Sequence, residues 1–185
     1  MKKITAFVFC LIFATSAYAD TNPFMGEHKN QMALNIGQGV NSGFLIPPPT
    51  QPVPFYFLHI QYSQPTTFFK LPARQSINIG QTLGFDSKYG WNWTDYTIPM
   101  IFLSEDIALA HGDKWYFATS IGMGLQAQQN ERLGAKLLFQ FKLIGGYRIN
   151  DKWGLEIFMQ HFSNANTAPE NYSYAFYGAG FTYSF

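Results

Sequence analysis

The sequence has few cysteines and few charges, and each shortage excludes a class of protein. Cys10 is the only cysteine among 185 residues, so the chain has no internal disulfide. Charged residues make up 12% of the chain, whereas an ordinary soluble domain has roughly 25%. No segment after the first 20 residues approaches the ~20 consecutive apolar residues of a membrane helix. An ordinary soluble domain and a helical membrane protein are therefore both disfavoured.

The first 19 residues have the pattern of a secretory signal peptide. Lys2 and Lys3 precede an apolar run over 4–14, and Ser16-Ala17-Tyr18-Ala19 supplies small residues for cleavage after Ala19. We therefore expect a signal peptide over 1–19 and one mature domain over 20–185. Removal of two of the 12 basic residues leaves 10 against 11 acidic residues, and this balance argues against a nucleic-acid partner.

Aromatic residues are abundant, at 18%, and they alternate with small or polar residues. Because successive side chains of a strand point to opposite faces, this alternation predicts β-strands. We expect a proline-rich loop over Asn41–Pro54, a turn near Pro72-Ala73 and an irregularity at Pro99. The eight predicted strands cover about 32–36, 56–71, 77–85, 95–110, 115–125, 137–149, 153–163 and 172–185.

An even number of strands after a signal peptide predicts an all-β fold, an eight-stranded antiparallel transmembrane β-barrel. The connections after the predicted strands four and six are short, and bacterial barrels place their short turns in the periplasm. The termini are therefore expected to be periplasmic. From Trp153 the strand then rises ~25 Å at a tilt of about 40°, which brings Ser163 to the outer rim of the apolar band.

The predicted strand over 153–163 carries the most informative pattern of the chain. Its even positions are expected to face a polar lumen, together with Gln140, Lys142 and Arg148 of the preceding strand. Its odd positions are expected to face lipid, where a polar pair needs an explanation. These odd positions are Trp153, Leu155, Ile157, Met159, His161 and Ser163.

The pair His161 and Ser163 allows two interpretations. The first is that both are interfacial polar residues in contact with water. The second is that His161 activates Ser163 as a nucleophile, because the two Cα atoms lie ~7 Å apart on one face. Asn164, Ala165 and Asn166 follow at once and could offer a side-chain amide and backbone N–H groups to an oxyanion.

The motif His161-Phe162-Ser163-Asn164-Ala165 on the penultimate strand resembles the lipid A 3-O-deacylase (PagL) family. The resemblance extends over about 139–185 and includes the segment Phe139–Arg148, which is similar to strand six of the family. It implies a serine hydrolase without metal or cofactor, which opens onto the membrane and removes the 3-hydroxyacyl chain at the 3-position of lipid A.

The resemblance also implies the roles of individual residues. His161 would be the general base and Ser163 the nucleophile, while Asn164 and the N–H groups of Ala165 and Asn166 would form the oxyanion hole. Glu170 is the only carboxylate between Ser163 and the end of the chain, so it is the candidate acid. An ungapped match instead places Ala175 at the acid position. Either a loop aims Glu170 at His161 or the pair is a dyad.

The implied location is the outer membrane of a Gram-negative cell, with the site at the outer leaflet. The partner would be lipopolysaccharide, and the barrel would be a monomer or a homodimer. One alternative is another outer-membrane lipid acyl hydrolase or acyltransferase. Another is a structural or adhesive barrel whose proline-rich loop binds a partner.

Overall fold

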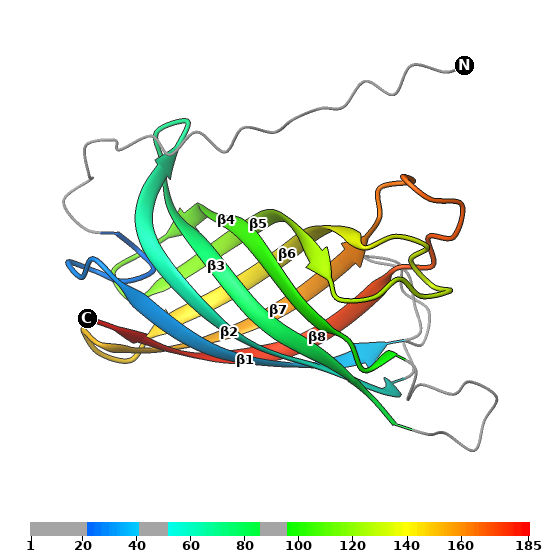
Figure 1. The fold of residues 1–185 in the computed structure, drawn as a ribbon. Helices are drawn as coiled ribbons and strands as arrows, with labels where there is room; N and C mark the ends of the chain where they lie inside the picture. The colour runs from blue at the N-terminus through cyan, green and yellow to red at the C-terminus, as the bar shows by residue number, and fades with distance from the viewer. Residues whose placement is uncertain (1–21, 41–51, 86–95) are drawn as a thin grey trace.

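The computed structural model describes residues 22–40, 52–85 and 96–185. The predicted signal peptide with Cys10 and most of the two loops expected near 41–54 and 86–94 lie outside the described residues. Eight antiparallel strands form a closed barrel in which β8 pairs with β1 (Figure 1). They are β1 (Gln31–Val40), β2 (Pro52–Phe68), β3 (Leu71–Gly84), β4 (Pro99–His111), β5 (Trp115–Gln126), β6 (Leu137–Arg148), β7 (Trp153–Ser163) and β8 (Tyr174–Ser184).

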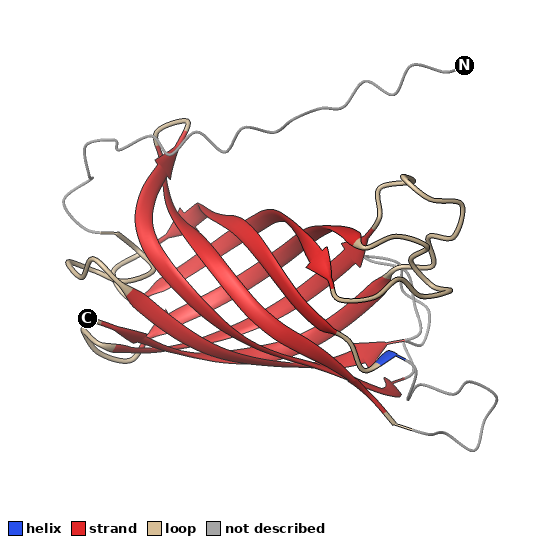
Figure 2. Cartoon of the chain, viewed as in Figure 1, coloured by secondary structure: helices blue, strands red, loops and turns tan. Residues whose placement is uncertain are grey.

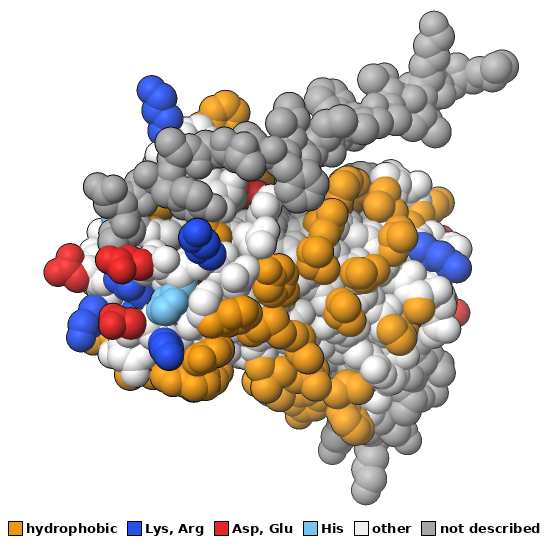
Figure 3. All heavy atoms as spheres, turned by 60° about the vertical axis from the view of Figure 1, so that its left-hand side comes forward, with side chains coloured by type: hydrophobic (Ala, Val, Ile, Leu, Met, Phe, Trp, Pro, Cys, Tyr) orange, Lys and Arg blue, Asp and Glu red, His pale blue; other side chains and the backbone are white. Residues whose placement is uncertain are grey.

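The wall of the barrel consists of strands, and the loops gather at its two ends (Figure 2). Along β7 the even residues are buried in the lumen, whereas the odd residues from Trp153 to Ile157 are exposed and those from Met159 to Ser163 are half-buried. This confirms the predicted assignment of the two faces. Apolar side chains accordingly cover much of the outer wall (Figure 3).

None of the helical segments among the residues that the structure describes is long and apolar enough to cross a membrane.

The hairpin between β2 and β3 differs from the prediction. Its turn is Phe69-Lys70, with φ angles of 47° and 71°, whereas Pro72 and Ala73 pair with Thr67 and Thr66 inside the ladder. The predicted turn at Pro72-Ala73 is therefore wrong. No turn residue marks the true turn in the sequence, because two residues other than glycine occupy the left-handed region there.

The loop expected over Asn41–Pro54 ends earlier than predicted, and Pro99, expected inside a strand over 95–110, is the first residue of its strand. β2 begins at Pro52 and contains Pro54, where the β1–β2 register shifts between Gln38 and Val40. A proline that needs no ladder partner is tolerated at such an irregularity. β4 begins at Pro99, and its register shift lies between Ala108 and Ala110 rather than at the proline.

The start of β8 also differs from the prediction. β8 begins at Tyr174 instead of Tyr172, because Tyr172 N–H donates to the Arg132 carbonyl of the β5–β6 loop at 2.7 Å. The backbone of Tyr172 thus contacts a loop rather than a neighbouring strand.

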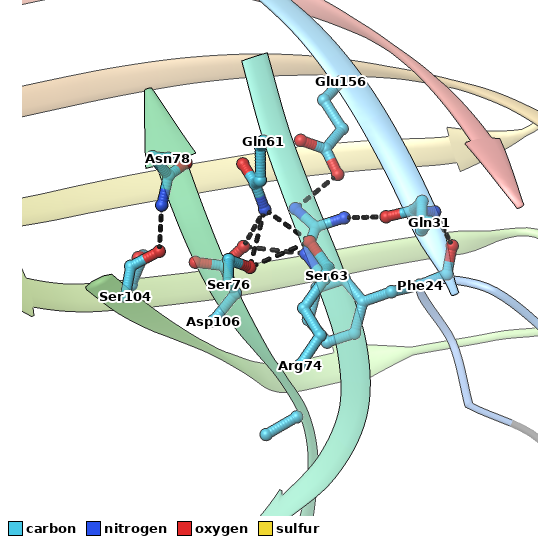
Figure 4. Close-up of polar contacts among 12 residues, drawn as sticks. Phe24, Gln31, Gln61, Ser63, Arg74, Ser76, Asn78, Ser104, Asp106 and Glu156 are labelled. Carbon is cyan, nitrogen blue, oxygen red and sulfur yellow. Dashed lines mark hydrogen bonds and ion pairs between the residues drawn. The ribbon is translucent and has the colours of Figure 1, made fainter. Parts of the chain in front are cut away.

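The interior has two halves of different chemistry. At the barrel end away from residues 22–30 and the C-terminus, buried apolar side chains form one cluster, which contains Phe55, Phe57, Tyr96, Met100, Phe102, Leu133, Leu138, Phe162, Tyr174 and Phe176. At the other end, which we call the termini end, a smaller apolar cluster that includes Phe24 and Tyr116 lies beside Arg74. Arg74 forms ion pairs with Asp106 and Glu156, both at 2.7 Å (Figure 4). Tyr116 donates to the same Glu156 carboxylate. We call these the aromatic half and the ionic half.

Candidate active site

His161 and Ser163 lie together on the outward face of β7, at the barrel end farther from the termini. Both are half-buried, and Ser163 is the last residue of the strand. Ser163 pairs with Phe139 of β6, and His161 lies between Phe141 of β6 and Ala175 of β8. The structure thus places the predicted base and nucleophile at adjacent outward positions at the rim of the barrel.

Phe162 fixes this part of β7 from the inside. Its side chain is fully buried, and its ring lies 5.3 Å from that of Phe57 and 5.4 Å from that of Phe102, both edge to face. Aromatic pairs of this geometry stabilise beyond the area they bury. The aromatic half therefore holds the backbone between His161 and Ser163 in one position.

Asn164 connects two loops through its side chain, in addition to the role expected from the motif. Its buried side-chain amide donates to the carbonyls of Leu133, at 2.5 Å, and Glu170, at 2.7 Å. Its Oδ1 accepts the N–H of Asn166 at 2.7 Å. Asn164 thereby joins the β5–β6 loop to the β7–β8 loop, and its amide hydrogens are engaged in this arrangement.

The chain turns sharply directly after Asn164. Ala165 and Asn166 have φ angles of 50° and 60°, and Thr167 N–H donates to the Asn164 carbonyl at 3.0 Å. Such left-handed conformations cost about 1–3 kcal/mol each and concentrate at functional sites. The N–H of Asn166 is engaged, whereas that of Ala165 has no acceptor among the described residues. Ala165 N–H is therefore available to an external oxygen.

Glu170 lies in the same loop, but its carboxylate is directed toward the β5–β6 loop. The side chain is exposed, and Oε2 lies 2.8 Å from the position that a Cβ on Gly134 would take. The residue directly across from His161 on β8 is Ala175. The structure therefore brings His161 and Ser163 onto one face, while the Glu170 carboxylate lies beside Gly134.

The β5–β6 loop supports the site through residues that the sequence did not single out. The Arg132 guanidinium donates to the carbonyls of Tyr172, at 3.2 Å, and Ser173, at 3.0 Å, and burial lowers its pKa. Asn130 donates to the Tyr174 hydroxyl at 2.6 Å. The one signal in the sequence was Leu133, the single large apolar residue of a polar loop, whose side chain is fully buried.

Asn171 is a second support that the motif did not identify. Its Oδ1 accepts the N–H of Asn164 at 3.1 Å, and its Nδ2 donates to Asn166 Oδ1 at 3.0 Å. Asn171 thus contacts the backbone before the turn and a side chain within it. These two contacts hold the turn that follows Ser163.

Comparison with known proteins identifies the family. The sequence model of the lipid A 3-O-deacylase (PagL) family matches residues 56–184. The chain belongs to this family. Members are outer-membrane β-barrel enzymes that deacylate lipid A, so the chain is an integral outer-membrane protein and a lipid A deacylase. The predicted resemblance, the eight-stranded antiparallel barrel and the outer-membrane location are confirmed.

A solved structure of an outer membrane enzyme shares the fold at low sequence identity. A crystal structure of the outer membrane enzyme PagL is 16% identical, with a TM-score of 0.53, and the match covers 82% of this chain and 97% of that one. The Yersinia pestis outer membrane protein Ail, in a phospholipid bilayer nanodisc, is 10% identical, with a TM-score of 0.49 and coverage of 84% and 99%. No curated protein matches the sequence.

Proposed function

We propose that the chain is a serine esterase that hydrolyses the ester of the 3-hydroxyacyl chain at the 3-position of lipid A. The observation that carries this proposal is the pair His161 and Ser163 on the outward face of β7. A lipid reaches an outward face from within the bilayer without leaving it. A buried lumen filled by aromatic side chains offers no comparable path.

The reaction follows the general logic of an activated serine. His161 takes the proton of the Ser163 hydroxyl as Oγ attacks the ester carbonyl carbon. The oxyanion accepts a hydrogen bond from Ala165 N–H, in the turn that Asn164 and Asn166 hold. The tetrahedral intermediate then expels the 3-hydroxyl of the glucosamine, which takes the proton from His161. Water, deprotonated by His161, cleaves the acyl-serine and releases the 3-hydroxy fatty acid.

We propose Glu170 as the acid that orients His161. It is the only carboxylate between Ser163 and the end of the chain, and it lies in the loop that follows Ser163. For this role its side chain must turn from Gly134 toward β7, on binding of substrate. If it does not turn, His161 and Ser163 act as a dyad, and substitution of Glu170 leaves the rate unchanged.

The proposed orientation places the termini in the periplasm and the site at the outer leaflet, where lipid A of lipopolysaccharide lies. It is supported by the short turns that follow β2, β4 and β6 at the termini end, because short turns of such barrels are periplasmic. The secreted mature chain would then be 20–185, acting as a monomer or a homodimer.

A serine-reactive fluorophosphonate tests the nucleophile directly. We expect the purified barrel in lipid to be labelled at Ser163 and the variant Ser163→Ala to remain unlabelled. Ser173→Ala is the matched control, because Ser173 lies in the adjacent β7–β8 loop on the chain leading into β8 and should not change labelling. Labelling that persists in Ser163→Ala would contradict the assignment. Release of fatty acid from phospholipid instead of lipid A would show that the proposed substrate is wrong.

A further inference from the structure

A charged cleft lies at the termini end of the barrel, opposite the proposed active site. It has a volume of about 570 Å³ and lies between the segment before β1 and the turn joining β6 to β7. Binding clefts for small groups typically measure about 300–1,000 Å³. Figure 3 shows acidic, basic and histidine side chains gathered at this end. The lining residues are Gly26, Glu27, His28, Arg148, Asp151 and Lys152.

Arg148 is held in place at the edge of this cleft. Its Nη2 donates to the Asp113 carbonyl, and its Nη1 lies 2.6 Å from the position that a Cβ on Gly26 would take. Gly26 has a φ of 65° and leaves room for the guanidinium. Arg148 Nε is buried and has no hydrogen-bond partner among the described residues. The guanidinium is therefore held in a fixed position beside the cleft.

The lining combines both signs of charge. Arg148 and Lys152 supply cations, and Glu27 and Asp151 supply carboxylates. A guanidinium and an ammonium bind phosphate oxygens through charge-assisted hydrogen bonds. Carboxylates accept hydrogen bonds from a primary ammonium group. The chemistry therefore fits a zwitterion that carries a phosphodiester and a primary ammonium, rather than a simple anion.

Aromatic residues place the cleft at the level of lipid headgroups. Tyr147 directly precedes Arg148, and Trp153 directly follows Lys152; both rings are exposed on the outer wall. The Trp153 ring stacks on Phe181 at 4.9 Å and contacts Tyr183 at 4.4 Å. Aromatic girdles of this kind mark the boundary between hydrocarbon and headgroups. Lys152, in the turn between these two aromatic residues, therefore lies at the level of the lipid headgroups.

We propose that this cleft binds the phosphoethanolamine headgroup of a phospholipid in the leaflet opposite the active site. Arg148 and Lys152 bind the phosphodiester, and Glu27 and Asp151 accept hydrogen bonds from the ammonium group. The site is independent of Ser163 and of the proposed hydrolysis, because it lies at the other end of the barrel.

Native mass spectrometry of the full barrel, released from nanodiscs, tests this proposal. The nanodiscs contain equal amounts of phosphatidylethanolamine, phosphatidylcholine and phosphatidylglycerol. We expect preferential retention of phosphatidylethanolamine, because choline cannot donate hydrogen bonds to the carboxylates and glycerol carries no charge. Lys152→Gln and Asp151→Asn should each reduce this retention about ten-fold or more, as expected for loss of one charge-assisted hydrogen bond.

The control variant is Lys114→Gln. Lys114 is exposed in the turn between β4 and β5 at the same end of the barrel, and it does not line the cleft. Retention should be unchanged in this variant, and deacylation of lipid A should be unchanged in Lys152→Gln. Equal retention of the three lipids, or an equal loss in Lys114→Gln, would overturn the proposal.

A competition experiment separates a lipid site from a site for free phosphate. We expect soluble glycerophosphoethanolamine to displace the retained lipid at concentrations at which inorganic phosphate does not. Equal displacement by inorganic phosphate would identify a small-anion site and would contradict the proposed lipid ligand.

Discussion

The two halves of the barrel interior are held together by different interactions. In the aromatic half, rings such as Phe57, Phe102 and Phe162 pack directly behind the outward-facing His161 and Ser163. In the ionic half, Arg74 binds two buried carboxylates. Close packing fixes the position of a strand, whereas a buried ion pair is costly to break and weak evidence for net stability. We therefore expect the aromatic half to affect catalysis and the ionic half to affect stability alone.

Loss of the proposed base should have the largest effect. His161→Ala should lower kcat for lipid A deacylation by about 10²–10⁴-fold, because general base catalysis contributes on that order. KM and thermal stability should change little, because His161 lies on the outward face and outside the buried clusters. Fatty-acid release from lipopolysaccharide micelles measures the rate. A kcat within about two-fold of wild type would remove His161 from the mechanism.

Substitution in the ionic half should reduce stability without changing the chemistry. Arg74→Leu leaves Asp106 and Glu156 buried without their cation, and breaking a buried pair in this way costs about 3–5 kcal/mol. Urea unfolding of the barrel in lipid vesicles measures this loss. The folded variant should retain the kcat of wild type. A large fall in kcat of the folded barrel would contradict the separation of the two halves.

Substitution in the aromatic half should lower kcat even where the loss of unfolding free energy is small. Phe162→Leu leaves unfilled volume among Phe57, Phe102 and Phe176 and should cost about 1–2 kcal/mol of unfolding free energy. Because the residue lies between His161 and Ser163, kcat should fall by about ten-fold or more even where the barrel is folded. Leu138→Ala is a control in the same cluster, outside β7. An equal fall in kcat in the control would assign the effect to general loosening.

A substitution at Ala175, directly across from His161 on β8, should raise kcat. This is the smallest of the expected effects. Ala175→Glu places a carboxylate beside the imidazole on the same face and should raise kcat by up to about ten-fold, by holding the tautomer that accepts the Ser163 proton. Glu170→Gln is the companion variant. If Glu170 serves as the acid, this variant lowers kcat, and Ala175→Glu restores it. Unchanged kcat in Glu170→Gln would establish a dyad.

Local periodicity sufficed to predict most of the fold. The faces of β7 followed from alternation alone, because a lipid-facing wall and a filled lumen impose opposite preferences on successive residues. The turn at Phe69-Lys70 was missed because its two left-handed residues are not glycine. The late start of β8 was missed because it depends on a contact between Tyr172 and the distant Arg132.

The candidate site was predictable only in part, for the same reason. The position of His161 and Ser163 is a property of one strand, so their spacing in the sequence was sufficient. The contacts of Asn164 with Leu133, and of Arg132 with Ser173, join two loops that are far apart in the sequence. The side-chain direction of Glu170 depends on the same loop packing. No short motif carries that information.

Mass spectrometry of lipid A tests the central claim most directly. Wild type and Ser163→Ala are expressed in a Gram-negative host whose lipid A is unmodified, and insertion of both barrels is confirmed. We predict that wild type removes one 3-hydroxyacyl group from lipid A and that Ser163→Ala leaves the spectrum unchanged. The same loss in both, or in neither, would contradict the proposal that Ser163 on the outer wall of this barrel is the nucleophile.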